Sequence, residues 1–162
     1  MTHLLVNISQ LVCVASSPLS FSRGRDMQNL HCINNASMLF DERILWVGSH
    51  EEGLERFAHS ATVIDAGARV VMPGFVDSHS HVVFAGNRAD EYARRLQGVS
   101  YQQIAAEGGG ILSTVRAVRA ASEDELYEQG RKLALSAMRH GTTTLEIKSG
   151  YALSLDDELK ML

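Results

Sequence analysis

Two histidines separated by one residue, His79 and His81, are the residues of this sequence best suited to metal chemistry. They stand at the end of an apolar stretch, Phe75–His79, that predicts a β-strand. Residues i and i+2 of a strand point to the same face, so both imidazoles can reach one ion. Neutral imidazole binds zinc and also iron. Asp77 could orient a ligating histidine, or it could instead cap the end of the strand.

A histidine pair at this spacing is by itself a weak signal, because two unrelated loop histidines give the same pattern. The strand that Pro73-Gly74 introduces is what favours the metal-binding interpretation. A second glycine cluster, Gly108–Gly110, precedes a predicted helix. It lacks the Gly-Lys-Ser/Thr ending and the Gly-x-Gly-x-x-Gly spacing of phosphate-binding loops, so it does not indicate nucleotide binding.

The elements after Pro73 follow the order strand, helix, strand, helix. The segment Ser122–Glu125 has the pattern of a capping box and predicts the start of a long helix. Gly141 is placed to end that helix, Thr142–Lys148 is rich in β-branched residues, and Ser154 is placed to cap a further helix. This order is typical of parallel strands joined by helical crossovers.

The first 72 residues follow a different pattern and predict a small, mostly antiparallel β module. The expected elements are strands at Leu4–Val6 and Leu11–Val14 with a turn at Asn7–Gln10, a loop over Ser16–Leu30, a hairpin of Ala36–Phe40 and Ile44–Val47, a short helix at Glu51–His59, and strands at Thr62–Asp65 and Arg69–Met72.

Composition excludes several classes of protein. The 162 residues carry 15 Lys and Arg against 19 Asp and Glu, a net charge of −4, and 45% are hydrophobic. Such a chain has enough apolar material for a core, lacks the basic excess of a nucleic-acid or anionic-membrane surface, and has no apolar run long enough to span a bilayer. Cys13 and Cys32 form no metal-binding pair, and the N-terminus has no basic leader. We therefore expect a cytoplasmic protein with no nucleic-acid or membrane partner.

Several stretches in order resemble one family. They are Pro73–His81 (PGFVDSHSH), Val83–Glu91 (VFAGNRADE), Arg95–Tyr101 (RLQGVSY), Glu107–Arg116 (EGGGILSTVR) and Gly141–Tyr151 (GTTTLEIKSGY). The first resembles the metal-binding strand of the amidohydrolase superfamily, and together they resemble the imidazolonepropionase family.

The resemblance implies roles for individual residues. His79 and His81 match the first two ligands of a single Zn²⁺ or Fe³⁺ ion. Arg88 matches a substrate-binding arginine, and a guanidinium suits the bidentate binding of a carboxylate. Tyr151 matches a substrate-contacting tyrosine, and Ala152 stands where we would expect glycine. No catalytic acid or base is assigned among these residues.

The resemblance also implies a fold: an N-terminal fragment in which residues 1–72 form half of a composite β-sandwich domain and residues 73–162 form the first two units of a metal-dependent (β/α)8 TIM barrel. A complete barrel needs roughly 250 residues.

The implied activity is the hydrolysis of 4-imidazolone-5-propanoate to N-formimino-L-glutamate in histidine degradation, by a metal-activated water, and the longer enzyme could be a homodimer. We expect the fragment alone to be inactive. Two alternatives stay open: another cyclic-amide hydrolase, similar to hydantoinase or dihydroorotase, and a non-catalytic truncated product.

Overall fold

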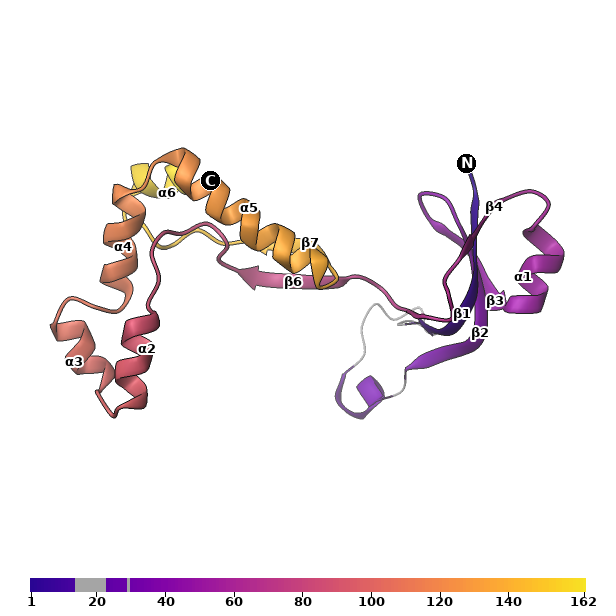
Figure 1. The fold of residues 1–162 in the computed structure, drawn as a ribbon, viewed down its shortest axis with the longest axis horizontal. Coiled ribbons are helices and arrows are strands. Elements are labelled where there is room, and N and C mark those ends of the chain that lie inside the picture. Colours follow the sequence, from indigo (N-terminus) through magenta and orange to yellow (C-terminus); the bar gives the residue numbers. More distant parts are fainter. Residues whose placement is uncertain (14–22, 29) are drawn as a thin grey trace. The chain divides into compact units, whose positions relative to one another are not determined.

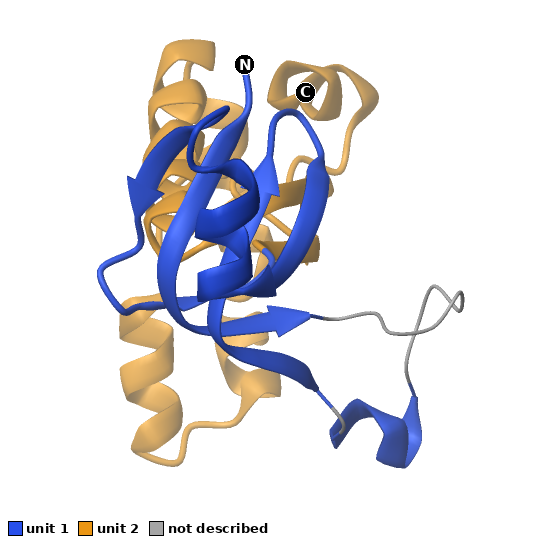
Figure 2. Cartoon of the chain, turned by 90° about the vertical axis from the view of Figure 1, so that its right-hand side faces the viewer, with its two compact units in different colours: residues 1–73 blue, residues 74–162 orange. Residues whose placement is uncertain are grey.

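The computed structural model describes residues 1–13, 23–28 and 30–162. The chain divides into two compact units, Met1–Pro73 and Gly74–Leu162 (Figure 2). The expected loop over Ser16–Leu30 and the end of the expected strand at Val14 lie largely outside the described residues.

Unit 1 is a five-stranded sheet with one short α-helix (Figure 1). The main path of the sheet runs β3-β2-β1-β4, and β5 also pairs with β1. Its elements are β1 (His3–Cys13), the 3-10 helix η1 (Gly24–Gln28), β2 (His31–Phe40), β3 (Ile44–Ser49), α1 (His50–Phe57), β4 (Thr62–Asp65) and β5 (Val70–Val71).

The first strand differs from the sequence prediction. Residues 3–13 form one strand, and the turn expected at Asn7–Gln10 was wrong. The pairing of β1 with β2 shifts register between Leu5 and Ile8, and Asn7 adopts a positive φ of 56°. Asparagine tolerates this conformation, so the chain forms a bulge and the strand continues. The Asn7 side chain donates to Asp65 Oδ1 at 2.8 Å, which joins the bulge to β4.

The sheet is mixed, whereas the sequence predicted a mostly antiparallel module. The β2–β3 hairpin and α1 are confirmed. Strands β4 and β5, however, both pair parallel to β1. Ile8 and Leu4 on β1 are fully buried, in two separate apolar clusters. The centre of the sheet therefore carries the core of unit 1.

Unit 2 contains two parallel strands and five helices among the described residues (Figure 1). Its elements are β6 (Phe75–Ser80), α2 (Ala89–Leu96), α3 (Tyr101–Ala106), α4 (Ile111–Ala120), α5 (Glu123–Arg139), β7 (Thr142–Ile147) and α6 (Leu155–Met161). The expected order of strand, helix, strand, helix and the parallel pairing of β6 with β7 are confirmed.

The two strands start very close together. A Cβ added to Gly74 would lie 2.3 Å from Thr143 Cγ2, so only glycine fits at the start of β6. The Phe75 amide donates to the carbonyl of Gly141 at 2.8 Å, and the Lys148 amide donates to the carbonyl of Ser80 at 2.8 Å. The pairing shifts register between Phe75 and Val76 and between Asp77 and Ser80, but it links the strands at both ends, and their carboxyl ends lie at the same edge.

Helix α5 begins and ends where the sequence predicts. The Ser122 hydroxyl accepts from the Glu125 amide at 3.2 Å, and Glu125 Oε2 accepts from the Ser122 amide at 2.8 Å, which confirms the capping box. These contacts lower the pKa of the Glu125 carboxyl, with the backbone bond from Ser122 as the largest cause. Leu126 and Gly130 are the buried residues of α5.

The expected cap on α6 is wrong in one detail. Ser154 occupies the N-cap position, but its hydroxyl donates to Asp157 Oδ2 at 2.6 Å instead of accepting from a backbone amide. This contact lowers the pKa of the Asp157 carboxyl.

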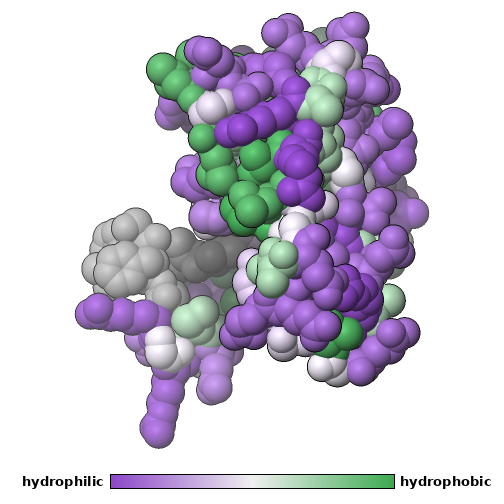
Figure 3. Space-filling view, turned by 90° about the vertical axis from the view of Figure 1, so that its left-hand side faces the viewer, coloured by the Kyte–Doolittle hydropathy of each residue, from purple (hydrophilic) through white to green (hydrophobic). Residues whose placement is uncertain are grey.

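Some apolar side chains of unit 2 remain at the surface. Figure 3 shows such side chains grouped on one face between hydrophilic ones. Leu112, Leu153, Leu155 and Leu159 are each more than half exposed. Among the described residues, no helix combines the length and the apolar character that crossing a membrane requires.

The capping box gives a direct prediction for the helix. In a peptide of residues 119–141, Ser122→Ala should reduce helicity, because the Glu125 amide loses its acceptor at a cost of about 0.5–1 kcal/mol. Circular dichroism at 222 nm and low temperature measures this change. Ser136→Ala, in the last turns of the same helix, is the matched control and should not reduce helicity. Equal helicity of the Ser122 and Ser136 variants would contradict the role of the cap.

Candidate functional site

A pocket in unit 2 brings together residues from the loops that follow β6 and β7. Its volume is about 460 Å³. His81 comes from the end of β6 and Tyr151 from the loop after β7. Further lining residues come from the segment between the strands; they include Phe84, Asn87, Arg88, Glu91, Tyr92, Tyr101 and Thr114. Three of the four sequence-predicted site residues thus line one pocket.

The fourth, His79, lies beside His81. The two ring centroids are 5.5 Å apart and the rings are edge to face. His79 is exposed, whereas His81 is half-buried and its Nδ1 atom is buried without a hydrogen-bond partner. A buried polar atom without a partner is costly unless a ligand satisfies it. Among the described residues, no group of three or more His, Cys, Asp and Glu side chains could hold a metal ion together.

Asp77 contacts the chain around the histidines rather than their rings. Its Oδ1 accepts from the His79 amide at 3.1 Å, and its Oδ2 accepts from the Ser80 hydroxyl. The Ser80 contact is the main reason that the pKa of the Asp77 carboxyl lies below its usual value. Of the two roles left open by the sequence, this geometry is that of a strand-end cap. It shapes the backbone from which both histidines project.

Arg88 is held by a neighbouring carboxylate. Its Nε donates to Glu91 Oε2 at 2.9 Å, and its side chain is 41% exposed against 16% for Glu91. The other oxygen, Glu91 Oε1, accepts from the Gly110 amide at 3.0 Å. In the part of the chain that the structure describes, the two Nη atoms of Arg88 have no hydrogen-bond partner. They are therefore available to an anionic group in the pocket.

Tyr151 packs its ring between two aromatic neighbours. Its centroid is 4.5 Å from that of His81 and 6.3 Å from that of Phe84. Ala152, which stands where glycine was expected, does not have a positive φ. Its methyl group is instead fully buried in a cluster with Val118 and Leu126. The left-handed conformations in this loop are at Gly150, with φ of 127°, and at Leu153, with φ of 57°.

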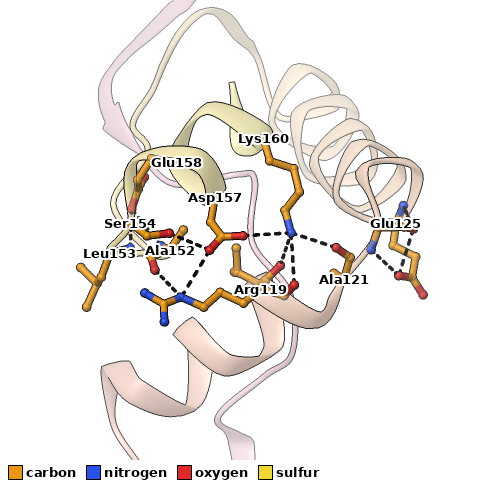
Figure 4. Close-up of polar contacts among 11 residues, drawn as sticks. Arg119, Ala121, Glu125, Ala152, Leu153, Ser154, Asp157, Glu158 and Lys160 are labelled. Carbon is orange, nitrogen blue, oxygen red and sulfur yellow. Dashed lines mark hydrogen bonds and ion pairs between the residues drawn. The ribbon is translucent and has the colours of Figure 1, made fainter.

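One carboxylate organises the loop around Tyr151 (Figure 4). Glu158 accepts from the amides of Gly150 at 2.6 Å and of Ala152 and Leu153 at 2.8 Å each. Burial raises the pKa of the Glu158 carboxyl, but these backbone bonds and a hydrogen bond from the Ser149 side chain outweigh burial and hold the pKa below its usual value. Sequence reasoning missed this residue. It placed no specific role on Glu158, although a carboxylate shortly after a loop with glycine is a weak signal for such a contact.

Arg119 contacts the same loop, and Lys160 contacts the end of α4. Arg119 Nε donates to the Ala152 carbonyl at 2.8 Å. Lys160 Nζ donates to the carbonyls of Val118, Arg119 and Ala121 at 3.0–3.3 Å, so it caps the C-terminal end of α4. Figure 4 shows Arg119 and Lys160 reaching across between α4 and α6.

The structure also shows the contacts of the glycine cluster and of two charged residues that the sequence analysis left without a role. In the glycine cluster, the Gly110 amide donates to Glu91 Oε1. Glu146 and Lys148, to which the sequence assigned no chemistry, pair with each other along β7.

Comparison with known proteins relates the whole chain to one group of sequences. Imidazolonepropionase of Symbiobacterium thermophilum is 49% identical over 162 residues, which cover 98% of this chain and 37% of that protein. Imidazolonepropionase of Aliivibrio salmonicida is 59% identical over 108 residues, covering 67% of this chain and 26% of that protein. The resemblance inferred from the motifs is thus confirmed. No family model matches the chain.

The chain spans a little over a third of the length of the relatives it matches across its own full length. Among solved structures, guanine deaminase of E. coli shares the fold with a TM-score of 0.59 and 18% identity over 91% of this chain and 30% of that chain. This likeness is one of fold alone. It agrees with the mixed α/β class that the sequence predicted.

Proposed function

Because the chain is related in sequence to the imidazolonepropionases over 98% of its length, we propose that it forms the part of such an enzyme that holds the first metal ligands and the substrate's carboxylate. The reaction is the hydrolysis of the cyclic amide of 4-imidazolone-5-propanoate to N-formimino-L-glutamate. The observation that carries the proposal is that His81, Arg88 and Tyr151, matched one by one to that family's motifs, line a single pocket.

The proposed fold follows from the same relation. Unit 2 would be the first two βα units of a (β/α)8 barrel, and unit 1 would be one part of a composite β-sandwich. Three features support the assignment of unit 2: the parallel pairing of β6 with β7, the helical crossover between them, and the fold shared with guanine deaminase. In such barrels, active sites lie at the carboxyl ends of the strands, where His81 and Tyr151 stand.

His79 and His81 would hold the metal, zinc or ferric iron. Their adjacent rings and the buried, unpartnered Nδ1 of His81 fit this role. A metal bound there would supply Lewis acidity, which would lower the pKa of a bound water far enough to make hydroxide available at neutral pH. Two ligands are fewer than the three or four that such sites use, so further ligands must come from outside the described residues.

Arg88 would bind the propionate carboxylate of the substrate. Glu91 occupies only its Nε, which leaves the two Nη atoms to form parallel hydrogen bonds with a carboxylate. This contact holds the tail of the substrate, so the ring carbonyl carbon stays within reach of the attacking water. Tyr151, which lines the same pocket, would also contact the substrate. We assign no proton-transferring residue within this chain.

The test is to supply the rest of the enzyme. A hybrid protein joins this chain to the part of the Symbiobacterium relative beyond the matched region. We expect the hybrid to hydrolyse 4-imidazolone-5-propanoate and the 162-residue chain alone to be inactive, since it offers too few metal ligands. Substrate loss is followed by ultraviolet absorbance. A folded hybrid that hydrolyses hydantoins or dihydroorotate instead would favour another cyclic-amide hydrolase, and a folded hybrid with no activity would favour a non-catalytic product.

Arg88→Ala in the hybrid tests the substrate assignment. The loss of charged hydrogen bonds to the propionate should raise KM about ten- to a hundredfold. The matched control is Arg131→Ala, which removes an exposed arginine that pairs with Glu128 on α5. Steady-state kinetics of both variants measure the difference. An unchanged KM for Arg88→Ala, or an equal rise in the control, would remove Arg88 from the binding site.

A further inference from the structure

The loop that carries Tyr151 depends on a carboxylate from the next helix. Glu158 Oε1 accepts from the amides of Ala152 and Leu153, and Oε2 accepts from the amide of Gly150. These amides lie on both sides of Tyr151 in the chain. Because the carboxylate is a rigid, planar acceptor, it fixes the backbone before and after the tyrosine at the same time.

The loop would not keep this conformation by itself. Leu153 has a positive φ of 57°, which is unfavourable for a residue with a branched side chain, and its side chain is 56% exposed. Burial of the Leu153 side chain therefore does not compensate the strain. The contacts that impose this conformation are the carboxylate bond to its amide and the anchoring of Ala152 next to it.

The helix that carries Glu158 is itself fixed. Lys160, two residues further on, donates to three carbonyls at the end of α4, and Met161 is buried in the same cluster as Ala152. Helix α6 has only seven residues. These tertiary contacts therefore hold Glu158 in place, and Glu158 in turn holds the loop.

We infer that Glu158 is a positioning residue, whose carboxylate holds the loop after β7 so that the ring of Tyr151 lies against His81 in the pocket. The inference rests on the proposed function in one respect: the effect on kinetics requires that Tyr151 touches the substrate. The placement of the ring does not require it.

The placement is tested first, in the 162-residue chain without any turnover. Tyr151 is replaced site-specifically by 3-fluorotyrosine, so that a single ¹⁹F signal reports its surroundings. The rings of His81 and Phe84 should displace this signal from that of the free amino acid. Glu158→Gln keeps the size of the side chain but replaces one acceptor oxygen with a donor, and Glu158→Ala removes both acceptors. Both should move the signal toward the free value.

The matched control is Asp156→Asn, which removes one negative charge from an exposed position in the first turn of the same helix. It should leave the signal in place. The inference is overturned if the wild-type signal already has the free value, or if neither Glu158 variant moves it. If circular dichroism shows that Glu158→Ala prevents folding, the signal of Glu158→Gln alone decides whether Glu158 places the Tyr151 ring.

The second test measures whether Glu158 acts through Tyr151. In the hybrid protein, Glu158→Gln should lower kcat/KM about tenfold, mainly through KM, as expected for a misplaced hydrogen-bonding partner. Tyr151→Ala should lower it at least as much. Combining the two substitutions should cause no further loss, because the loop then has no ring to position. Additive losses would overturn the inference. A hybrid that hydrolyses no imidazolone would instead refute the proposed function, and the fluorine signal would still decide the placement.

Discussion

The parallel pairing of β6 with β7 is the constraint on which the candidate site depends. Phe75 is paired with Thr142 at one end and Ser80 with Ile147 at the other. This pairing places the residues that follow both strands at one edge, so His81 after β6 and Tyr151 after β7 share a pocket. A shift of one residue would turn the side chains of one strand to the opposite face and separate them.

Two carboxylates hold side chains of the pocket in place on the loops at this edge, and both do so by accepting hydrogen bonds. Glu91 binds the guanidinium of Arg88 with one oxygen and the amide of Gly110 with the other. Glu158 binds the amides around Tyr151. In both cases, an acidic residue that contributes no proposed chemistry satisfies backbone donors and orders a residue of the pocket. Loops have no regular hydrogen bonding of their own, so such acceptors decide their conformation.

The sequence predicted well those features that depend on neighbouring residues. The capping box at Ser122, the β2–β3 hairpin and the histidine pair at a strand end all follow from local spacing, and the structure has all three. The features that it did not predict depend on contacts between distant residues. The sequence pattern of β4 and β5 is the same for parallel and antiparallel pairing. Only the position of these strands beside β1 decides the direction in which they pair.

The roles of the two acidic residues were missed for a related reason. Glu91 accepts from an amide 19 residues away, a distance over which no periodic pattern operates. Glu158 is one of three acidic residues in the first turn of α6. Acidic residues at this position favour a general interaction with the helix dipole, so the sequence does not single out Glu158. Glycine was expected at position 152, but Ala152 has no positive φ and its methyl group is buried, whereas the positive φ lies at the neighbouring Leu153.

We propose that the strand end carrying His79 and His81 is a metal site. Its most direct test is the metal content of the purified hybrid protein, measured by inductively coupled plasma mass spectrometry. The account predicts about one zinc or iron ion per chain. It predicts almost none after combined His79→Ala and His81→Ala, in a variant whose circular dichroism is unchanged. Equal metal content in the two proteins would contradict it.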